Sequence, residues 1–197
     1  EGVYDPNILK AFFLAGGPGS GKSYVVRQTT GGLGMKIVNS DNAFEKFLKD
    51  ANLSLKMPDE EKYARDPVRA KAKNITQKQK SNYVEGRLGL IIDGTGKNYA
   101  KISDEATRLK QLGYDVHMVF VNTSLDTALE RNKRRSRSVP ESLVIKSWKD
   151  VQSNIGKFSQ YFRQNFVVVD NNDTDEDVMT PVYKQIKSLA LAKISNP

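Results

Sequence analysis

Eight residues near the amino terminus constrain the fold of this chain more than any other part of the sequence. Gly16–Ser23 reads GGPGSGKS and fits the pattern G-x-x-x-x-G-K-[ST]. An apolar run, Lys10–Ala15, precedes it, and a helical pattern that begins near Tyr24 follows it. Glycines let a backbone wrap around a phosphate without Cβ clashes, and a helix amino terminus adds partial positive charge. The order strand–loop–helix therefore predicts a phosphate loop rather than a flexible glycine turn.

The residues of this loop have separate expected roles. Lys22 can reach the β- and γ-phosphates of a nucleotide, and the Ser23 hydroxyl can ligate Mg²⁺. The segment therefore predicts ATP as the phosphoryl donor and Mg²⁺ as the cofactor. The residues expected to bind the phosphates are Gly17, Gly19, Ser20, Gly21, Lys22, Ser23 and Tyr24.

Short apolar runs alternate with helical patterns along the chain. The expected strands are Lys10–Ala15, Met35–Val38, Leu88–Ile92, Asp115–Val121 and Phe166–Asp170. The expected helices after the first are Asn42–Ala51, Lys101–Leu112, Leu125–Arg134, Glu141–Phe162 and Val178–Ile194. Continuous apolar strands in this order predict an α/β fold of the P-loop NTPase kind. Its three layers hold a five-stranded parallel sheet between helices, with an arginine-bearing lid.

The length of 197 residues suits one α/β domain, and the sequence shows neither an internal repeat nor a linker. We expect a single domain over residues 1–197, with a core of about 10–185. Two segments add to it: a helical insertion on the acceptor side at about 52–86 and a lid at about 131–140. Pro67 is expected to break the insertion helix or to begin a new one.

The composition excludes several classes of site. The chain has no cysteine and one histidine, His117, which excludes disulfides, thiolate zinc sites and clusters of histidine ligands. The apolar runs are of strand length, and no signal peptide pattern is visible, so we expect a cytoplasmic protein without membrane contact, most simply a monomer. The net charge of +8 favours anionic partners, or serves solubility alone.

Two further strands lead into acidic residues. In a doubly wound sheet the carboxyl ends of the strands face the crevice that holds the phosphate loop. Asp41 can accept a proton from a hydroxyl that attacks the γ-phosphate, or it can cap the next helix. Asp93 can hold the metal through water or position the acceptor, or it can stabilise a tight turn. Thr95 and Lys97 follow it and are candidate contacts of the acceptor.

A basic segment follows the helix that comes after the fourth strand. Arg131–Arg137 contains five basic residues in seven. Small P-loop kinases carry an arginine-bearing lid at this place, which closes over the triphosphate and neutralises charge. Arg131 and Arg135 are four residues apart, so they would share a helix face and could both contact phosphates. The alternative is a solvated basic loop. The last strand end, Asp170-Asn171-Asn172, lies where many P-loop kinases contact adenine.

Together these motifs resemble the zeta-toxin and polynucleotide-kinase branch of the P-loop kinases. The motifs are Gly16–Ser23, Asp41-Asn42-Ala43-Phe44, Asp93-Gly94-Thr95 and the lid sequence ALERNKRRSRSVP, within about residues 10–170. The resemblance implies that Asp41 activates the acceptor hydroxyl and that Arg131 and Arg135 clamp phosphates. It also suggests a phage-type enzyme, in the host cytoplasm if phage-encoded, because phages encode kinases that act on hydroxymethyl pyrimidines in DNA. Polynucleotide kinases carry an arginine shortly after the base, and this chain has none near Phe44.

The acceptor is expected to be a hydroxyl on DNA, on a hydroxymethyl pyrimidine or at a 5′ end. From residue 61 to 80, seven basic residues outnumber two acidic ones. Arg65, Arg69 and Lys73 would form one stripe on a continuous helix and could follow a nucleic-acid backbone. The tyrosines that could stack on bases are Tyr63, Tyr83 and Tyr99. The alternative for this region is a solvated helix face with ordinary core tyrosines.

Two other functions stay open on the sequence. The first is a small-molecule kinase that acts on a UDP-sugar or a nucleoside, as zeta toxins do. The second is a nucleic-acid-associated ATPase in which water replaces the acceptor.

Overall fold

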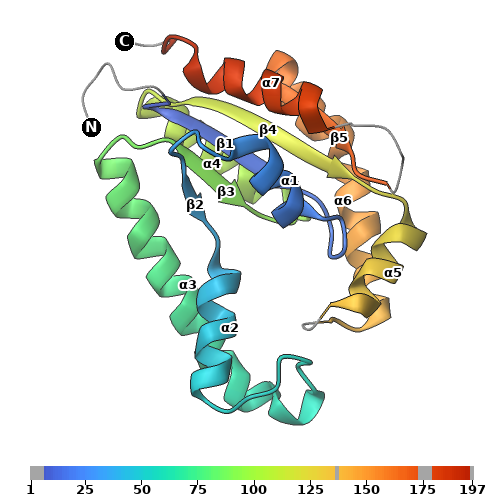
Figure 1. Cartoon of the computed structure of the whole chain (residues 1–197). Helices are drawn as coiled ribbons and strands as arrows, with labels where there is room; N and C mark the ends of the chain where they lie inside the picture. The colour runs from blue at the N-terminus through green and yellow to red at the C-terminus, as the bar shows by residue number, and fades with distance from the viewer. Residues whose placement is uncertain (1–6, 136–137, 173–178, 196–197) are drawn as a thin grey trace.

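The segment Gly16–Ser23 follows the central strand of a parallel sheet (Figure 1). The computed structural model describes residues 7–135, 138–172 and 179–195. The sheet has the order β2-β3-β1-β4-β5, and every neighbouring pair is parallel. The strands are β1 (Lys10–Ala15), β2 (Lys36–Val38), β3 (Leu90–Asp93), β4 (Asp115–Asn122) and β5 (Phe166–Asp170). The predicted five-stranded parallel sheet is confirmed.

Helices cover both faces of this sheet, as continuous apolar strands require. The helices are α1 (Lys22–Thr30), α2 (Ser40–Asp50), α3 (Lys62–Glu85), α4 (Tyr99–Gln111), α5 (Leu125–Arg134), α6 (Glu141–Phe162) and α7 (Met179–Leu191). Helices α1 and α7 pack on one face, and α4 and α6 pack on the other. Among the described helices, none is both long and apolar enough to cross a membrane.

The central strand β1 divides the core into two clusters. Phe12 and Leu14 pack with residues of α1 and α7, whereas Ala11 and Phe13 pack with residues of α4 and α6. Every residue of β1 is buried. The phosphate loop is therefore attached to the most fully buried strand of the molecule's described part.

Several elements have the bounds that the sequence predicts, namely β1, α5, α6 and β5. The third strand differs, because it begins at Leu90 rather than Leu88. The Leu88 N–H donates to the Tyr83 carbonyl at 2.9 Å, so Leu88 belongs to the turn that closes α3. The last helix is described from Met179, and residue 178 lies outside the described residues.

The predicted insertion forms a helical pair with α2 beside the edge strand β2 (Figure 1). Phe44 and Leu48 of α2 pack against Ala72 of α3 in a small third core. The expectation that Pro67 breaks the helix is wrong, since α3 continues through it. Pro67 lies in the second turn and removes one backbone bond, and the neighbouring Val68 packs against the third core.

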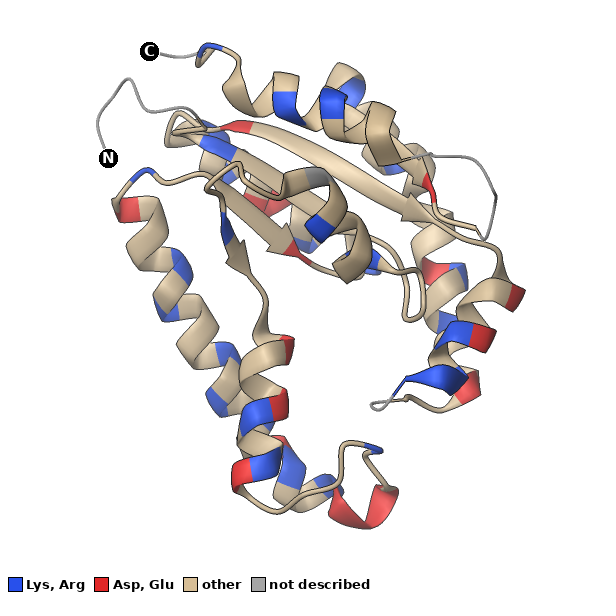
Figure 2. Ribbon diagram, viewed as in Figure 1, with Lys and Arg blue, Asp and Glu red and all other residues tan. Residues whose placement is uncertain are grey.

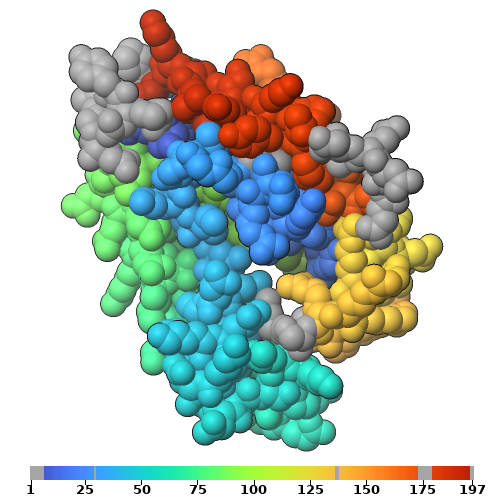
Figure 3. Space-filling view, viewed as in Figure 1, coloured from blue at the N-terminus to red at the C-terminus, as the bar shows by residue number. Residues whose placement is uncertain are grey.

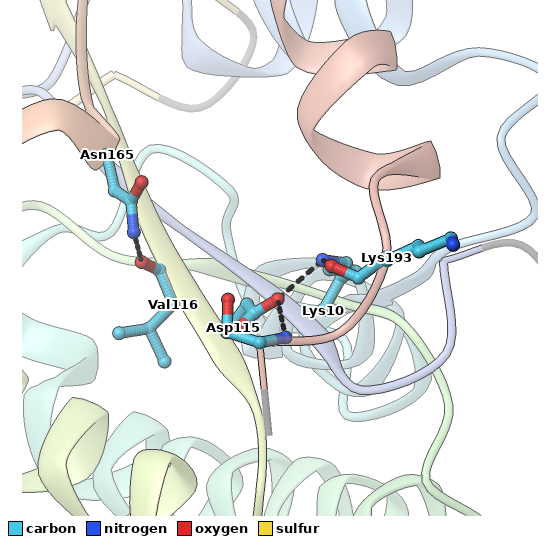
Figure 4. Close-up of polar contacts among 6 residues, drawn as sticks. Lys10, Asp115, Val116, Asn165 and Lys193 are labelled. Carbon is cyan, nitrogen blue, oxygen red and sulfur yellow. Dashed lines mark hydrogen bonds and ion pairs between the residues drawn. The ribbon is translucent and has the colours of Figure 1, made fainter. Parts of the chain in front are cut away.

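The opposite end of the sheet is fixed by an ion pair (Figure 4). Lys10 Nζ lies 2.6 Å from Asp115 Oδ2, and both side chains are largely buried. The same groups bond the C-terminal segment, through the Lys193 carbonyl at 3.3 Å and the Ser195 N–H at 3.2 Å. Burial alone would raise the pKa of Asp115, but the hydrogen bond and charge of Lys10 outweigh it, and the net shift is downward.

His117 is a core residue of β4. Its ring stacks on that of Phe12 with a centroid separation of 4.7 Å. Burial lowers the pKa of His117 to about 4, so the ring is neutral at pH 7.

The burial pattern of β5 predicts unequal effects of two neighbouring valines on stability. Val169 is 1% exposed and Val168 is 47% exposed. We expect Val169→Ala to lower the free energy of unfolding by about 2 kcal/mol, through lost transfer energy and a residual cavity. Val168→Ala loses the same strand propensity but much less buried volume, so a change below about 1 kcal/mol is expected. Urea unfolding measures both variants, and equal losses would contradict the described register of β5.

Candidate active site

The phosphate loop approaches the backbone and side chains of two distant segments. Gly19 and Gly21 have φ values of 80° and 83°, in the left-handed region that favours glycine. A Cβ on Gly19 would lie 2.1 Å from the carbonyl oxygen of Ala128 in α5. A Cβ on Gly21 would lie 2.3 Å from Nδ2 of Asn171, which follows β5. The loop can therefore hold this position only with glycine at both places.

The other loop residues differ in exposure. Gly17 and Ser20 are buried, whereas Ser23 and Tyr24 are exposed in the first turn of α1. The Ser20 hydroxyl is buried and has no hydrogen-bond partner among the described residues. A phosphate in the loop would offer it an acceptor.

Lys22 begins α1 and is surrounded by charged groups. Its Nζ donates to the Gly16 carbonyl at 2.7 Å. Burial lowers the pKa of Lys22, the charges of Asp93 and Asp41 act in the opposite direction, and that of Arg135 lowers it again. Three charged residues that the sequence singles out separately thus lie within electrostatic reach of the loop lysine.

Asp93 ends β3 and pairs in register with Leu14 of β1. Its Oδ2 accepts a hydrogen bond from Asn39 Nδ2 at 2.7 Å. Its Oδ1 is buried and has no hydrogen-bond partner among the described residues. Burial raises the pKa of Asp93, and the positive charge of Lys22 only partly opposes this. A carboxylate held in this way is ready for a cationic or hydrogen-bonding ligand.

The donor set fits Mg²⁺ bound together with phosphates. Within the described residues, no group of three or more His, Cys, Asp or Glu side chains could enclose a metal. Mg²⁺ at phosphate sites needs few protein ligands, because it keeps several waters and binds substrate oxygens. The Ser23 hydroxyl and the buried Asp93 Oδ1 could supply such a site, the latter through water.

Asp41 is the second residue of α2 and is half-buried. The alternative that Asp41 caps this helix is wrong, because the cap is Asn39. The Asn39 side chain accepts a hydrogen bond from the Asp41 N–H at 2.7 Å. The Asp41 carboxylate is thus not needed as the cap, and its charge acts on both Lys22 and Asp93.

The described part of the lid is attached to the phosphate loop. Arg131 Nη1 donates to the Asn171 carbonyl at 2.7 Å, and it lies 3.5 Å from the Cβ position of Gly21. Arg135 is exposed at the carboxyl end of α5, and its charge reaches Lys22 and Asp93. Residues 136 and 137 of the predicted lid lie outside the described residues.

Four asparagines join the parts of the site, and the sequence analysis assigns none of them this role. Asn171 Nδ2 donates to the Ser20 carbonyl at 2.8 Å. Asn132 bonds both backbone groups of Val139 across the lid, at 2.8 and 3.1 Å. Asn154 of α6 donates to two carbonyls of the loop after β3, each at 2.9 Å. Asn39 is the fourth. In the sequence, these residues could have been found as asparagines that follow a strand or that interrupt the apolar stripe of a helix.

The loop after β3 contributes mainly backbone groups to this site. The Thr95 carbonyl accepts from the Gly16 N–H at 2.9 Å. Lys97 is exposed, and its carbonyl is one of those held by Asn154. These bonds fasten the phosphate loop to the end of β3.

Arg65 and Arg69 of α3 contact α2 and the segment that joins α2 to α3. Arg65 Nη1 donates to the Pro58 carbonyl at 2.9 Å. The Arg69 guanidinium lies 4.5 Å from the centroid of the Phe44 ring in α2. Lys73 is exposed. The described contacts of the two arginines therefore lie within the insertion and α2, and not at the phosphate loop.

The three tyrosines separate into two groups. Tyr63 is 89% exposed at the start of α3. Tyr83 and Tyr99 pack against the larger core, and the Tyr99 ring lies 5.5 Å from that of Phe158. Tyr83 and Tyr99 thus serve the core rather than an exposed stacking surface.

The raised pKa of Asp93 predicts a pH-dependent gain in stability for Asp93→Asn without ligand. The folded state binds this proton more tightly than the unfolded state, so wild-type stability falls as the pH rises from below the unfolded pKa through the folded one. Asparagine mimics the protonated form and keeps an acceptor for Asn39. We expect the variant to melt a few degrees higher at pH 7, where about 1 kcal/mol shifts a domain of this size by roughly 2–4 °C.

Differential scanning calorimetry at several pH values checks this expectation. The advantage should shrink toward about pH 4, near the unfolded pKa of an aspartate. Asp50→Asn, at the exposed end of α2, is the control. An Asp93→Asn variant that melts at or below the wild type at pH 7 would contradict the described burial.

The chain is similar to one protein family and to several solved structures. The zeta toxin family model matches residues 9–180. No curated protein sequence is significantly similar to the chain.

Solved structures share the fold at low identity. A gluconokinase from Sinorhizobium meliloti 1021 is 15% identical with a TM-score of 0.56, over 93% of this chain and 94% of that one. The AvrRxo1-ORF1:AvrRxo1-ORF2 structure with sulphate ions is 15% identical with a TM-score of 0.63, over 96% of this chain and 69% of that one. A chain of the Pnkp1/Rnl/Hen1 RNA repair complex is 19% identical with a TM-score of 0.58, over 76% of this chain and 46% of that one. These likenesses establish the fold, and the family match extends over most of the chain. The chain therefore belongs to the zeta toxin family of P-loop kinases, enzymes that transfer a phosphoryl group to a hydroxyl.

Proposed function

We propose that this kinase transfers the γ-phosphoryl group of ATP to a hydroxyl that Asp41 orients and deprotonates. The observation that carries the proposal is the convergence of Asp41 with Lys22 and Asp93 beside the phosphate loop. The side-chain cap of α2 is supplied by Asn39, so capping does not explain the aspartate at position 41. A carboxylate can hold an acceptor hydroxyl and accept its proton late in a loose transition state.

The positive groups of the site have matching roles. Lys22 and the loop backbone bind the β- and γ-phosphates, and Arg131 and Arg135 stabilise charge on the transferring group. Ser23 and, through water, Asp93 would hold Mg²⁺. When bound, Mg²⁺ neutralises charge on the phosphate oxygens.

We propose that the chain forms a single domain. The acceptor is proposed to bind between its helical insertion and its lid. Figure 3 shows a hollow in this face, bordered by α1 and α2 on one side and by the α5 region on the other. Asp41 lies near the amino terminus of α2, so the proposed base belongs to the insertion side. Arg131 and Arg135 belong to the lid side.

The favoured acceptor is a DNA hydroxyl, on a hydroxymethyl pyrimidine or at a 5′ end. The net charge of +8 supports a polyanion, and Figure 2 shows lysines and arginines along α3. Lys62, Lys73 and Lys78 are exposed there. One structural neighbour belongs to an RNA repair complex.

A second candidate is a small-molecule acceptor. Arg65 contacts the insertion and Arg69 contacts α2, so these two side chains are less available to a nucleic-acid backbone. One structural neighbour is a gluconokinase.

Asp41→Asn tests the proposed base. Loss of a general base typically lowers the rate by roughly 10²–10⁴-fold, so we expect kcat to fall within that range while ATP affinity is unchanged. Single-turnover transfer from γ-labelled ATP and calorimetric binding of ATP give the two quantities. Asp50→Asn on the same helix is the matched control and should behave as the wild type. Equal rates for the two variants would rule out Asp41 as the base.

An acceptor panel tests the function itself. Wild-type enzyme with γ-labelled ATP and Mg²⁺ is offered 5′-hydroxyl DNA, hydroxymethyl-pyrimidine DNA, RNA, nucleosides and UDP-sugars. We expect label in DNA, with an apparent affinity that falls steeply as salt rises, because binding a polyanion releases counterions. Label in a small molecule alone would favour the second candidate. ATP turnover that no acceptor changes would contradict the kinase proposal.

A further inference from the structure

One asparagine side chain joins the two acidic residues of the site. Asn39 follows β2 and precedes α2. Its Oδ1 accepts from the Asp41 N–H, and its Nδ2 donates to Asp93 Oδ2, both at 2.7 Å. The assignment of the amide is fixed by chemistry, because only the oxygen can accept from an N–H and only the nitrogen can donate to a carboxylate.

The bond to Asp93 restricts how that carboxylate is presented. The terminal torsion of an aspartate is broad and roughly two-fold, so an untethered carboxylate rotates easily. The Asn39 amide engages Oδ2, and Oδ1 stays buried without a hydrogen-bond partner among the described residues. The tether therefore determines which oxygen of Asp93 is left for a ligand.

Helix capping alone does not account for asparagine at this position. A cap needs only an acceptor, and serine or aspartate serves it about as well as asparagine. The Nδ2 donor has no part in the cap. Its one hydrogen bond recorded within the described residues goes to Asp93, which lies on another strand.

We propose that Asn39 is a positioning residue that holds the Asp93 carboxylate beside the phosphate loop while it fixes the start of the helix that carries Asp41. The proposal rests on the proposed function for the roles of the two acidic residues. Its structural content, a tether between Asn39 and Asp93, stands without it. Outer partners of this kind typically change metal affinity or activity by about 10–100-fold when removed.

Two variants separate the tether from the cap. Asn39→Ser keeps a capping oxygen and loses the donor. Asn39→Asp keeps the shape and the cap, but it places a second carboxylate against Asp93. Asn42→Ser, at an exposed position in the first turn of α2, is the matched control.

The first measurement is the affinity for ADP with and without Mg²⁺, by calorimetry. We expect Asn39→Ser to lose roughly tenfold of the Mg²⁺-dependent gain in affinity, and Asn39→Asp to lose more, while binding without Mg²⁺ stays near that of Asn42→Ser. A purely structural role of Asn39 would weaken ADP binding equally with and without Mg²⁺. An Asn39→Ser variant that matches the control in both conditions would overturn the proposal.

The second measurement does not depend on nucleotide or acceptor. Urea unfolding of Asn39→Ser, Asp93→Ala and the double variant forms a double-mutant cycle, in which Asp93→Ala removes the acceptor and Asn39→Ser removes the donor. We expect non-additive changes, because the first substitution removes the partner of the second. Additive changes would show that no tether exists, even if the acceptor panel confirms the kinase. A failed acceptor panel with a non-additive cycle would refute the proposed function and leave the tether standing.

Discussion

The close approach of the phosphate loop to its neighbours is the constraint on which the rest of the site depends. At Gly19 and Gly21 any Cβ would overlap the Ala128 carbonyl or the Asn171 amide. Those neighbours lie on α5 and at the end of β5, so the loop brings together segments more than a hundred residues apart. The lid arginine Arg131 is bonded to the same Asn171. Movement of the loop would therefore also disturb the groups expected to face the transferring phosphate.

Charge is concentrated in this region at a cost in stability. Burial disfavours the charged forms of Lys22 and Asp93, and each is only partly compensated by the other. A contrasting arrangement exists at the far end of the sheet, where Lys10 and Asp115 are paired at 2.6 Å and the net shift lowers the pKa of the carboxyl. The paired groups stabilise the fold, whereas the incompletely compensated groups suit a phosphate and a cation. This contrast follows the rule that perturbed groups gather where ligands bind.

Neutral amides carry much of the organisation between the elements. Asn39, Asn132, Asn154 and Asn171 each bond a segment distant from their own element or across a loop. An amide can donate and accept at once without adding charge, so it can join a carboxylate to a backbone N–H or bridge two carbonyls. Charged side chains in these places would have added to the uncompensated charge near Lys22 and Asp93.

Local pattern in the sequence determined the elements, the parallel sheet and the identity of the phosphate loop. Apolar run length, glycine spacing and residues such as Ser124, which caps α5, act over a few positions and can be read directly. The sequence also named Asp41, Asp93 and Arg135 as separate candidates. Only the tertiary structure decided that Asn39 and not Asp41 caps α2, that Pro67 lies within α3, and that Arg65 and Arg69 contact the insertion and α2. Those outcomes depend on which atoms meet after distant segments pack, and residue spacing along a chain does not encode such contacts.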